Sequence, residues 1–200
     1  LAGNDKILGG SGVDTLNGGD NDDHIYGYAG NDVLNGNADA DKILGGKDND
    51  TINGGAGDDD LRGEAGDDTI TSGAGSDTIS GGLGDDTFII VSFGNKTIDG
   101  SSGTDTVSIS YSGITSLLSF VTRTLSADGK TLTLVDANGG TIILTNIIDL
   151  SIGVGTGITI NSIAYDFVDA PTSGSGTGPY GDYDGYNLRP NTAKMDGQHF

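Results

Sequence analysis

One acidic side chain recurs at a fixed spacing through the first half of the chain. An aspartate stands at the sixth position of nine consecutive nine-residue segments between residues 9 and 89. These aspartates are Asp14, Asp23, Asp32, Asp41, Asp50, Asp59, Asp68, Asp77 and Asp86. Carboxylate oxygens are the ligands that hard cations such as calcium prefer, and calcium takes about six to eight oxygens. The spacing therefore indicates a row of cation sites.

The nine segments also share their glycine and apolar positions. They read GGSGVDTLN, GGDNDDHIY, GYAGNDVLN, GNADADKIL, GGKDNDTIN, GGAGDDDLR, GEAGDDTIT, SGAGSDTIS and GGLGDDTFI. The first position is Gly in eight of the nine, and the eighth is always apolar. Residues 1–8 are the remainder of an earlier copy, with Asp5 at the aspartate position. A short repeat that keeps one frame predicts a solenoid rather than a disordered acidic chain.

The fourth position of the repeat predicts the backbone that carries the aspartates. It is Gly in six repeats and Asn21, Asp39 or Asp48 in the other three. Gly, Asn and Asp are the residues that tolerate a positive φ, so we expect a left-handed turn conformation there. Each repeat then consists of a six-residue turn and a three-residue strand whose middle side chain points inward.

These segments match the pattern GGxGxDxUx and resemble the repeats-in-toxin (RTX, haemolysin-type) calcium-binding family. Gly100–Ser108 repeats the pattern once more, with Asp105 at the aspartate position. The resemblance implies an all-β fold: a parallel β-roll of 18-residue coils, a small antiparallel β cap and a flexible tail. It also implies calcium between turns n and n+2, held by the sixth-position aspartates from Asp5 to Asp105 and by turn carbonyls. The candidate carbonyls include those of Gly10, Gly12, Gly46, Gly55, Gly57, Gly66, Gly73, Gly75, Gly82 and Gly84.

Charge and composition agree with ions that take part in folding. The formal net charge is −20, from 29 acidic and 9 basic residues, and the chain has no cysteine. Ten tandem copies offer about eight pairings of stacked turns, or about +16 of bound charge. We therefore expect calcium binding and folding to be one event. The acidic charge excludes nucleic acid as a partner, and no apolar run is long enough for a membrane span.

The frame is broken once, within residues 90–99. Residues 91–99 (VSFGNKTID) place Lys96 where the aspartate belongs. An ammonium cannot ligate calcium but could neutralise a neighbouring turn. We interpret the segment as a degenerate coil that ends the run of ion sites, with Ile90 as a one-residue insertion; the alternative is a loop.

Other charged residues of the turns are given no ligand role. The second acidic residues before the ligand are interpreted as solvated turn residues, and three lysines as relieving local repulsion. These residues are Asp22, Asp58, Asp67 and Asp85, and Lys6, Lys42 and Lys47.

The predicted organisation has three segments. Residues 1–108 form the β-roll, degenerate at 90–99, and residues 109–170 a C-terminal β cap. Turn signals at Asp128-Gly129 and Asn138-Gly139-Gly140 separate the predicted strands of the cap. These strands are 121–126, 131–136 and 141–144, with others within 147–152 and 158–167. Residues 171–200 form a flexible linker and tail, where the resemblance places a secretion signal.

The sequence favours a binding and folding module over an enzyme. It contains neither HExxH nor GxSxG, and His24 and His199 are isolated from plausible catalytic partners. The chain begins without Met, so we expect an upstream domain of the same polypeptide. The resemblance implies the type I secretion machinery as a partner and a secreted, extracellular or cell-surface location in a Gram-negative-type bacterium. The alternatives are an accessory domain of a secreted hydrolase (protease, lipase or epimerase) and a surface-layer or adhesin module.

The two faces of the roll are expected to differ. If alternate repeats lie on opposite sheets, one face carries a Thr/Asn ladder, which leaves an ice-binding face as a minor alternative. The other face carries an apolar row of Leu8, Tyr26 and Leu44. We expect this row to be covered by the upstream domain, the Tyr-rich tail or a second copy of the chain. The row ends at Arg62, which favours the upstream domain.

Overall fold

The computed structural model describes residues 2–110, 120–126, 130–136, 139–147, 149–152, 160–161, 165–167 and 188–190. The chain divides into two compact units, Leu1–Ile163 and Ala164–Phe200. In the second unit, β18 (Tyr165–Phe167) pairs antiparallel with β19 (Leu188–Pro190). Every regular secondary-structure element in the described part of the chain is a β-strand, as predicted. The described residues contain no helix that could span a membrane. The boundaries predicted at residues 108 and 170 remain predictions.

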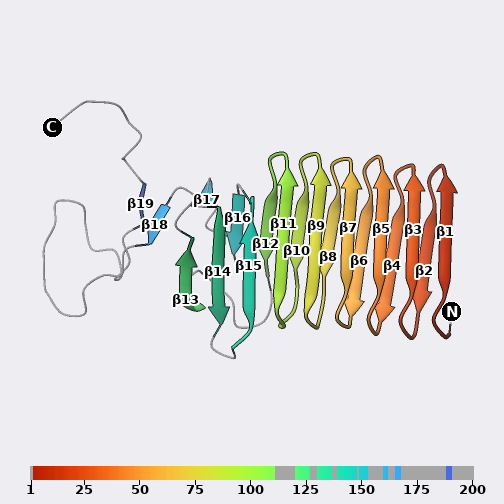
Figure 1. The fold of residues 1–200 in the computed structure, drawn as a ribbon, viewed down its shortest axis with the longest axis horizontal. Helices are drawn as coiled ribbons and strands as arrows, with labels where there is room; N and C mark the ends of the chain where they lie inside the picture. The colour runs from red at the N-terminus through yellow and green to blue at the C-terminus, as the bar shows by residue number, and fades with distance from the viewer. Residues whose placement is uncertain are drawn as a thin grey trace, which may run out of the picture. The chain divides into compact units, whose positions relative to one another are not determined.

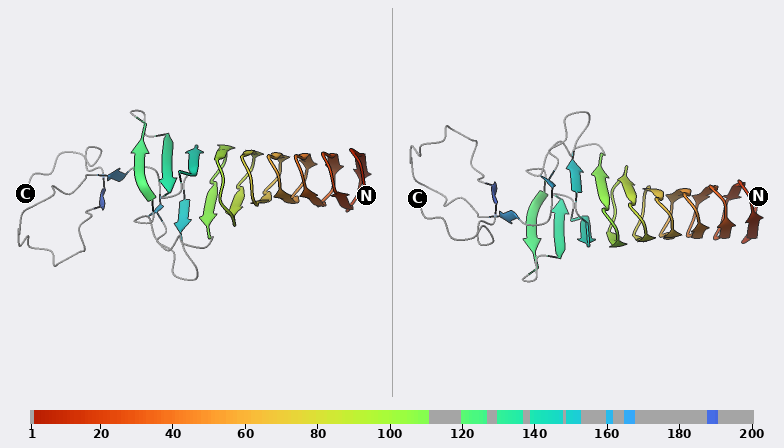
Figure 2. Two further views of the ribbon diagram at one scale, coloured as in Figure 1. Left: turned by 90° about the horizontal axis from the view of Figure 1, so that it is seen from below. Right: turned by 90° about the horizontal axis from the view of Figure 1, so that it is seen from above.

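Twelve strands of the first unit form two parallel sheets. They are β1 (Lys6–Ser11), β2 (Thr15–Gly19), β3 (His24–Ala29), β4 (Val33–Ala38), β5 (Lys42–Lys47), β6 (Thr51–Ala56), β7 (Asp60–Ala65), β8 (Thr69–Ser72), β9 (Asp77–Leu83), β10 (Thr87–Ile90), β11 (Lys96–Ser102) and β12 (Thr106–Ile109). Odd-numbered strands pair with one another in one sheet and even-numbered strands in the other (Figure 1). Successive strands therefore alternate between two layers along this part of the chain (Figure 2).

The register of the sheets confirms the predicted 18-residue coil. Ile25 lies opposite Ile7 on one side and Ile43 on the other, and Leu34 opposite Leu16 and Ile52 in the second sheet. Two nonapeptides therefore make one coil, and equivalent positions of every second repeat stack directly. This stacking is what brings turns 18 residues apart into contact.

The core of the roll is narrow. It receives one apolar side chain per repeat from the eighth position, and from Ile25 onward these side chains are at most 1% exposed. They are Ile25, Leu34, Ile43, Ile52, Leu61, Ile70, Ile79 and Phe88. A single row of apolar side chains from each sheet buries little area per residue of the repeat, so the turns must contribute to stability.

The positive φ predicted at the fourth position of the repeat is confirmed. A positive φ at the second position was not predicted. Asn21, Asp39 and Asp48 have φ values of 78°, 71° and 75°. The second position also has a positive φ in most repeats, including some without glycine. The non-glycine examples there are Tyr28, Asn37, Glu64 and Ser101.

Both sheets continue beyond β12 and then change direction. In the first sheet β11 pairs parallel with β15 (Thr141–Thr145), which pairs antiparallel with β14 (Thr131–Asp136). Strand β14 in turn pairs antiparallel with β13 (Phe120–Leu125). In the second sheet β12 pairs parallel with β16 (Asp149–Ile152), and β16 pairs antiparallel with β17 (Ile160–Asn161). Strands are thus present where the cap was predicted, but only part of their pairing is antiparallel, because β15 and β16 first extend the two parallel sheets.

Some residues of the predicted cap and linker lie outside the part of the chain that the structure describes. They are the turn signal at residues 128–129, the segment 153–159 and the linker at 171–179.

Candidate calcium sites

The sixth-position aspartates lie on the two edges of the roll, in or just after the turns that precede the strands. Those on one edge are Asp5, Asp23, Asp41, Asp59 and Asp77, and those on the other are Asp14, Asp32, Asp50, Asp68, Asp86 and Asp105. On each edge the Oδ1 atom of one aspartate accepts the backbone N–H of the aspartate one coil earlier. The nine such hydrogen bonds are 2.7–3.1 Å long. Each carboxylate is thereby held in one orientation.

The second carboxylate oxygen is the candidate cation ligand. In eight of these aspartates Oδ2 is buried and has no hydrogen-bond partner among the described residues. The eight are Asp23, Asp32, Asp41, Asp50, Asp59, Asp68, Asp86 and Asp105. A buried, unpaired carboxylate oxygen is strongly unfavourable, so eight of them along the two edges indicate a ligand that supplies positive charge.

The first-position glycines make room for these oxygens. A Cβ atom on Gly45 would lie 2.4 Å from Asp50 Oδ2 and 2.9 Å from the carbonyl oxygen of Gly63. The same construction at Gly63 gives 2.2 Å to Asp68 Oδ2. A carboxylate oxygen and a carbonyl oxygen of the next coil therefore both lie beside the first-position glycine. A Cβ atom at Gly45 or Gly63 would clash with the carboxylate oxygen in its present position.

Burial changes the protonation of these carboxyl groups. Loss of hydration raises the pKa of Asp41, Asp50, Asp59 and Asp86 to about 6, and that of Asp68 to about 7. Carboxylates stacked on the same edge raise these pKa values further, whereas the backbone N–H bonds lower them. Ionisation of the stacked carboxyl groups is therefore unfavourable unless a cation binds between them.

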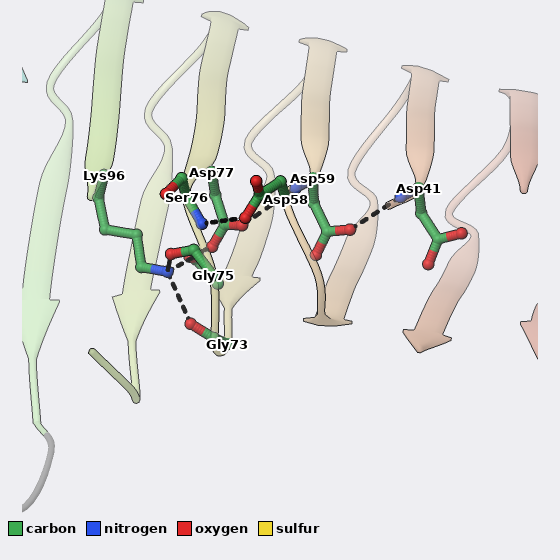
Figure 3. Close-up of polar contacts among 9 residues, drawn as sticks. Asp41, Asp58, Asp59, Gly73, Gly75, Ser76, Asp77 and Lys96 are labelled. Atoms are coloured by element: carbon green, nitrogen blue, oxygen red, sulfur yellow. Dashed lines mark hydrogen bonds and ion pairs between the residues drawn. The ribbon is translucent and has the colours of Figure 1, made fainter. Parts of the chain in front are cut away.

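Lys96 replaces the next aspartate on the first edge. Strand β11 pairs with β9 so that Lys96 lies opposite Asp77, which places residues 96–99 in a strand and not in a loop. The Lys96 ammonium donates to Asp77 Oδ2 at 2.6 Å and to the carbonyls of Gly73 and Gly75 at 2.7 Å each (Figure 3). On the opposite edge the aspartates continue to Asp105. The interruption therefore affects one edge of the roll only.

The fifth-position acidic residues have a role that the sequence interpretation missed. They are exposed, as expected of turn residues, but their Oδ1 atoms accept backbone N–H groups one coil later. Asp58 accepts from Ser76 at 2.7 Å, and Asp67 from Asp85 at 2.9 Å. Asp22 and Asp85 do the same with Ala40 and Thr104. Asp or Asn stands at this position in six of the nine repeats, which is the signal that could have revealed the ladder.

The other predicted ligands differ from one another in burial and in contacts. Asp5 and Asp14, at the N-terminal end, are only partly buried. Of the candidate carbonyls, those of Gly73 and Gly75 converge with Asp77, while that of Gly55 accepts the N–H of Ala74 at 3.0 Å. Within the described residues, no three His, Cys, Asp or Glu side chains gather at one point.

The outward-facing residues of the apolar row stack in the predicted register. Leu8, Tyr26 and Leu44 lie opposite one another, and the row ends at Arg62. Leu8 is 51% exposed. Lys6 lies over the ring of Tyr26 at 5.4 Å. Whether this row contacts another domain stays a prediction.

Comparison with known proteins agrees with this geometry. A family model for the RTX calcium-binding nonapeptide repeat (4 copies) matches residues 1–34, 17–52, 26–61, 35–70 and 53–88. None of the curated proteins matches the chain. The solution structure of the AlgE6R3 subunit from the Azotobacter vinelandii mannuronan C5-epimerase is 28% identical and covers 58% of this chain and 72% of its own. Its TM-score with this chain is 0.31. Residues 1–88 of the chain belong to the RTX calcium-binding nonapeptide repeat family.

Proposed function

We propose that the roll binds calcium between the turns of successive coils and that calcium binding drives the folding of the regular coils. The observation that carries this proposal is the set of eight buried Oδ2 atoms, on the two edges of the roll, without a partner among the described residues. About eight ions would bring about +16 of charge to a chain of net charge −20. Bound calcium would therefore remove most of the self-repulsion of the acidic chain.

The ligands of each ion would come from two stacked turns. The aspartate Oδ2 supplies charge, and the carbonyl oxygens of the glycine-rich turns supply neutral oxygens. Calcium accepts such an irregular cage, whereas Mg²⁺ requires a small octahedral one and releases its water reluctantly. The sites should accordingly prefer calcium.

We further propose that the chain is a non-catalytic folding and stability module of a larger exported protein. Two observations support this: the calcium-binding repeats, and the lack of the HExxH and GxSxG motifs. Extracellular calcium modules bind with dissociation constants of about 10⁻⁴–10⁻³ M. A roll in this range would stay unfolded inside the cell during type I export and fold outside.

Far-UV circular dichroism of the intact chain tests the central proposal. In excess chelator the repeat region should be largely disordered, and it should gain β-structure when millimolar calcium is added. Magnesium at the same concentration is the control and should give little β-structure. A β-rich spectrum in chelator that does not change with calcium would contradict the proposal.

A further inference from the structure

The Lys96 ammonium is enclosed by oxygen atoms. Its three N–H donors match the three acceptors described above: Asp77 Oδ2 at 2.6 Å and the carbonyls of Gly73 and Gly75 at 2.7 Å (Figure 3). Both side chains of the ion pair are 0% exposed. Lysine is almost never fully buried unless its charge is paired, so the burial of Lys96 depends on these contacts.

The ammonium lies where a cation is needed in the regular coils. Asp77 Oδ2 corresponds to the Oδ2 atoms of Asp41 and Asp59 on the same edge, which have no partner among the described residues. The donor comes from the turn stacked on Asp77, at the position where the next aspartate would stand. Its contacts of 2.6–2.7 Å are only slightly longer than the ~2.3–2.6 Å of calcium–oxygen bonds.

A second substitution meets the same oxygen. Ser72 is the only residue other than glycine at the first position of the nine repeats, and its hydroxyl donates to Asp77 Oδ2. At Gly54, the same position one coil earlier, a Cβ atom would lie 2.4 Å from Asp59 Oδ2. The two departures from the repeat, Ser72 and Lys96, therefore converge on one carboxylate. Among the buried sixth-position aspartates that the structure describes, Asp77 is the one whose Oδ2 has a hydrogen-bond partner.

We propose that Lys96 is a tethered cation that takes the place of calcium between the turns 72–77 and 91–96. The ammonium neutralises the one carboxylate that remains at this position, because the second aspartate is the residue that lysine has replaced. A calcium ion added here would lie against the ammonium and be repelled. This pair of turns therefore binds no calcium and stays closed without it. The inference rests on the proposed calcium sites in the regular coils.

Calcium stoichiometry of the intact chain tests the substitution. Isothermal titration calorimetry would compare the wild type with the double variant Lys96→Asp/Ser72→Gly, which restores the regular repeat. We expect the double variant to bind one more calcium ion than the wild type. The matched single variant Lys96→Met should gain none and should have a lower thermal midpoint in calcium. A double variant that folds in calcium with the wild-type number of ions, or a Lys96→Met variant that gains an ion, would overturn the proposal.

Hydrogen exchange of the wild type in excess chelator is a second test, which needs no variant to fold. The Asp77 N–H donates to the Asn95 carbonyl at 2.8 Å, and the Asp41 N–H to Asp59 Oδ1 at 2.9 Å on the same edge. We expect the Asp77 amide to exchange at least about tenfold more slowly than the Asp41 amide. Equal exchange would overturn the claim that this turn pair stays closed without calcium. Failure of the calcium function itself would appear separately, as a wild-type spectrum that calcium does not change.

Discussion

The backbone N–H of Asp50 donates to Oδ1 of Asp68, 2.8 Å away and one full coil later in the chain. Asp68 N–H makes the same bond to Asp86 at 2.9 Å. Asp68 thus uses one oxygen to join two coils, and its other oxygen is the proposed cation ligand. The scaffold and the candidate ion site share a single side chain, which explains why the aspartate position is invariant in the nine repeats.

Replacing a sixth-position aspartate should affect calcium binding more than replacing its neighbour. Asp68→Asn removes a buried carboxylate, whereas the control Asp67→Asn removes an exposed one of the same turn. We expect Asp68→Asn to weaken or abolish about two ion sites, because stacked turns share ligands. Asp67→Asn should bind the wild-type number of ions, since its amide oxygen can still accept the Asp85 N–H. Calorimetric titration measures both, and equal losses would show that the ligand assignment is wrong.

The stability of the roll should depend on pH in opposite directions with and without calcium. The ordinary aspartate pKa of 3.8 rises to about 6 at Asp50 and about 7 at Asp68 in the ion-free fold. The folded chain therefore binds more protons than the unfolded chain between about pH 4 and pH 7. Without calcium, its stability should be greatest below about pH 4 and fall as the pH rises through 6 to 7.

With calcium the order reverses, because the ligands must be deprotonated to bind the ion. The calcium concentration at the folding midpoint should increase as the pH falls from 7.5 to 5.5. Circular dichroism titrations at several pH values, with and without chelator, measure both trends. An unchanged midpoint over this range would mean that the raised pKa values do not describe the sites.

The parts of this structure that could be predicted from the sequence are those that recur in every repeat. The inward apolar residues, the aspartates and the positive φ at Asn21 or Asp39 all follow from residue type at one position of the frame. Each depends on local chemistry, so a pattern of nine residues is enough to reveal it.

The features that were missed depend on contacts across a coil or on backbone strain. The fifth-position ladder joins residues 18 apart, such as Asp58 and Ser76, and appears only when the register is known. The contacts of Lys96 with Gly73 and Gly75 require the length of a lysine side chain as well as the 19-residue offset from Asp77. The positive φ of Glu64 is imposed by stacking against regular coils, since glutamate does not favour it.

A first-position glycine should be intolerant of even one added carbon. A Cβ atom at Gly45 would lie 2.4 Å from Asp50 Oδ2, so Gly45→Ala should displace that oxygen and lose at least one ion. Lys47→Ala, an exposed change in the same turn, is the control and should leave the ion count unchanged. Calorimetric titration with calcium checks both variants. Normal binding by Gly45→Ala would mean that the carboxylate oxygen does not lie beside the glycine when the ion is bound.

Two lysines that each lie 2.6 Å from a carboxylate should differ greatly in their contribution to stability. Lys42 pairs with Asp60 where the side chains are 34% and 31% exposed, whereas the Lys96–Asp77 pair is 0% exposed. Lys42→Met should lower the free energy of unfolding by no more than about 1 kcal/mol, because solvent screens an exposed pair. Lys96→Met leaves the Asp77 carboxylate buried with one donor fewer, which typically costs about 3–5 kcal/mol. Urea unfolding in saturating calcium measures both losses, and similar small values would show that the buried ammonium contributes no more than a surface charge.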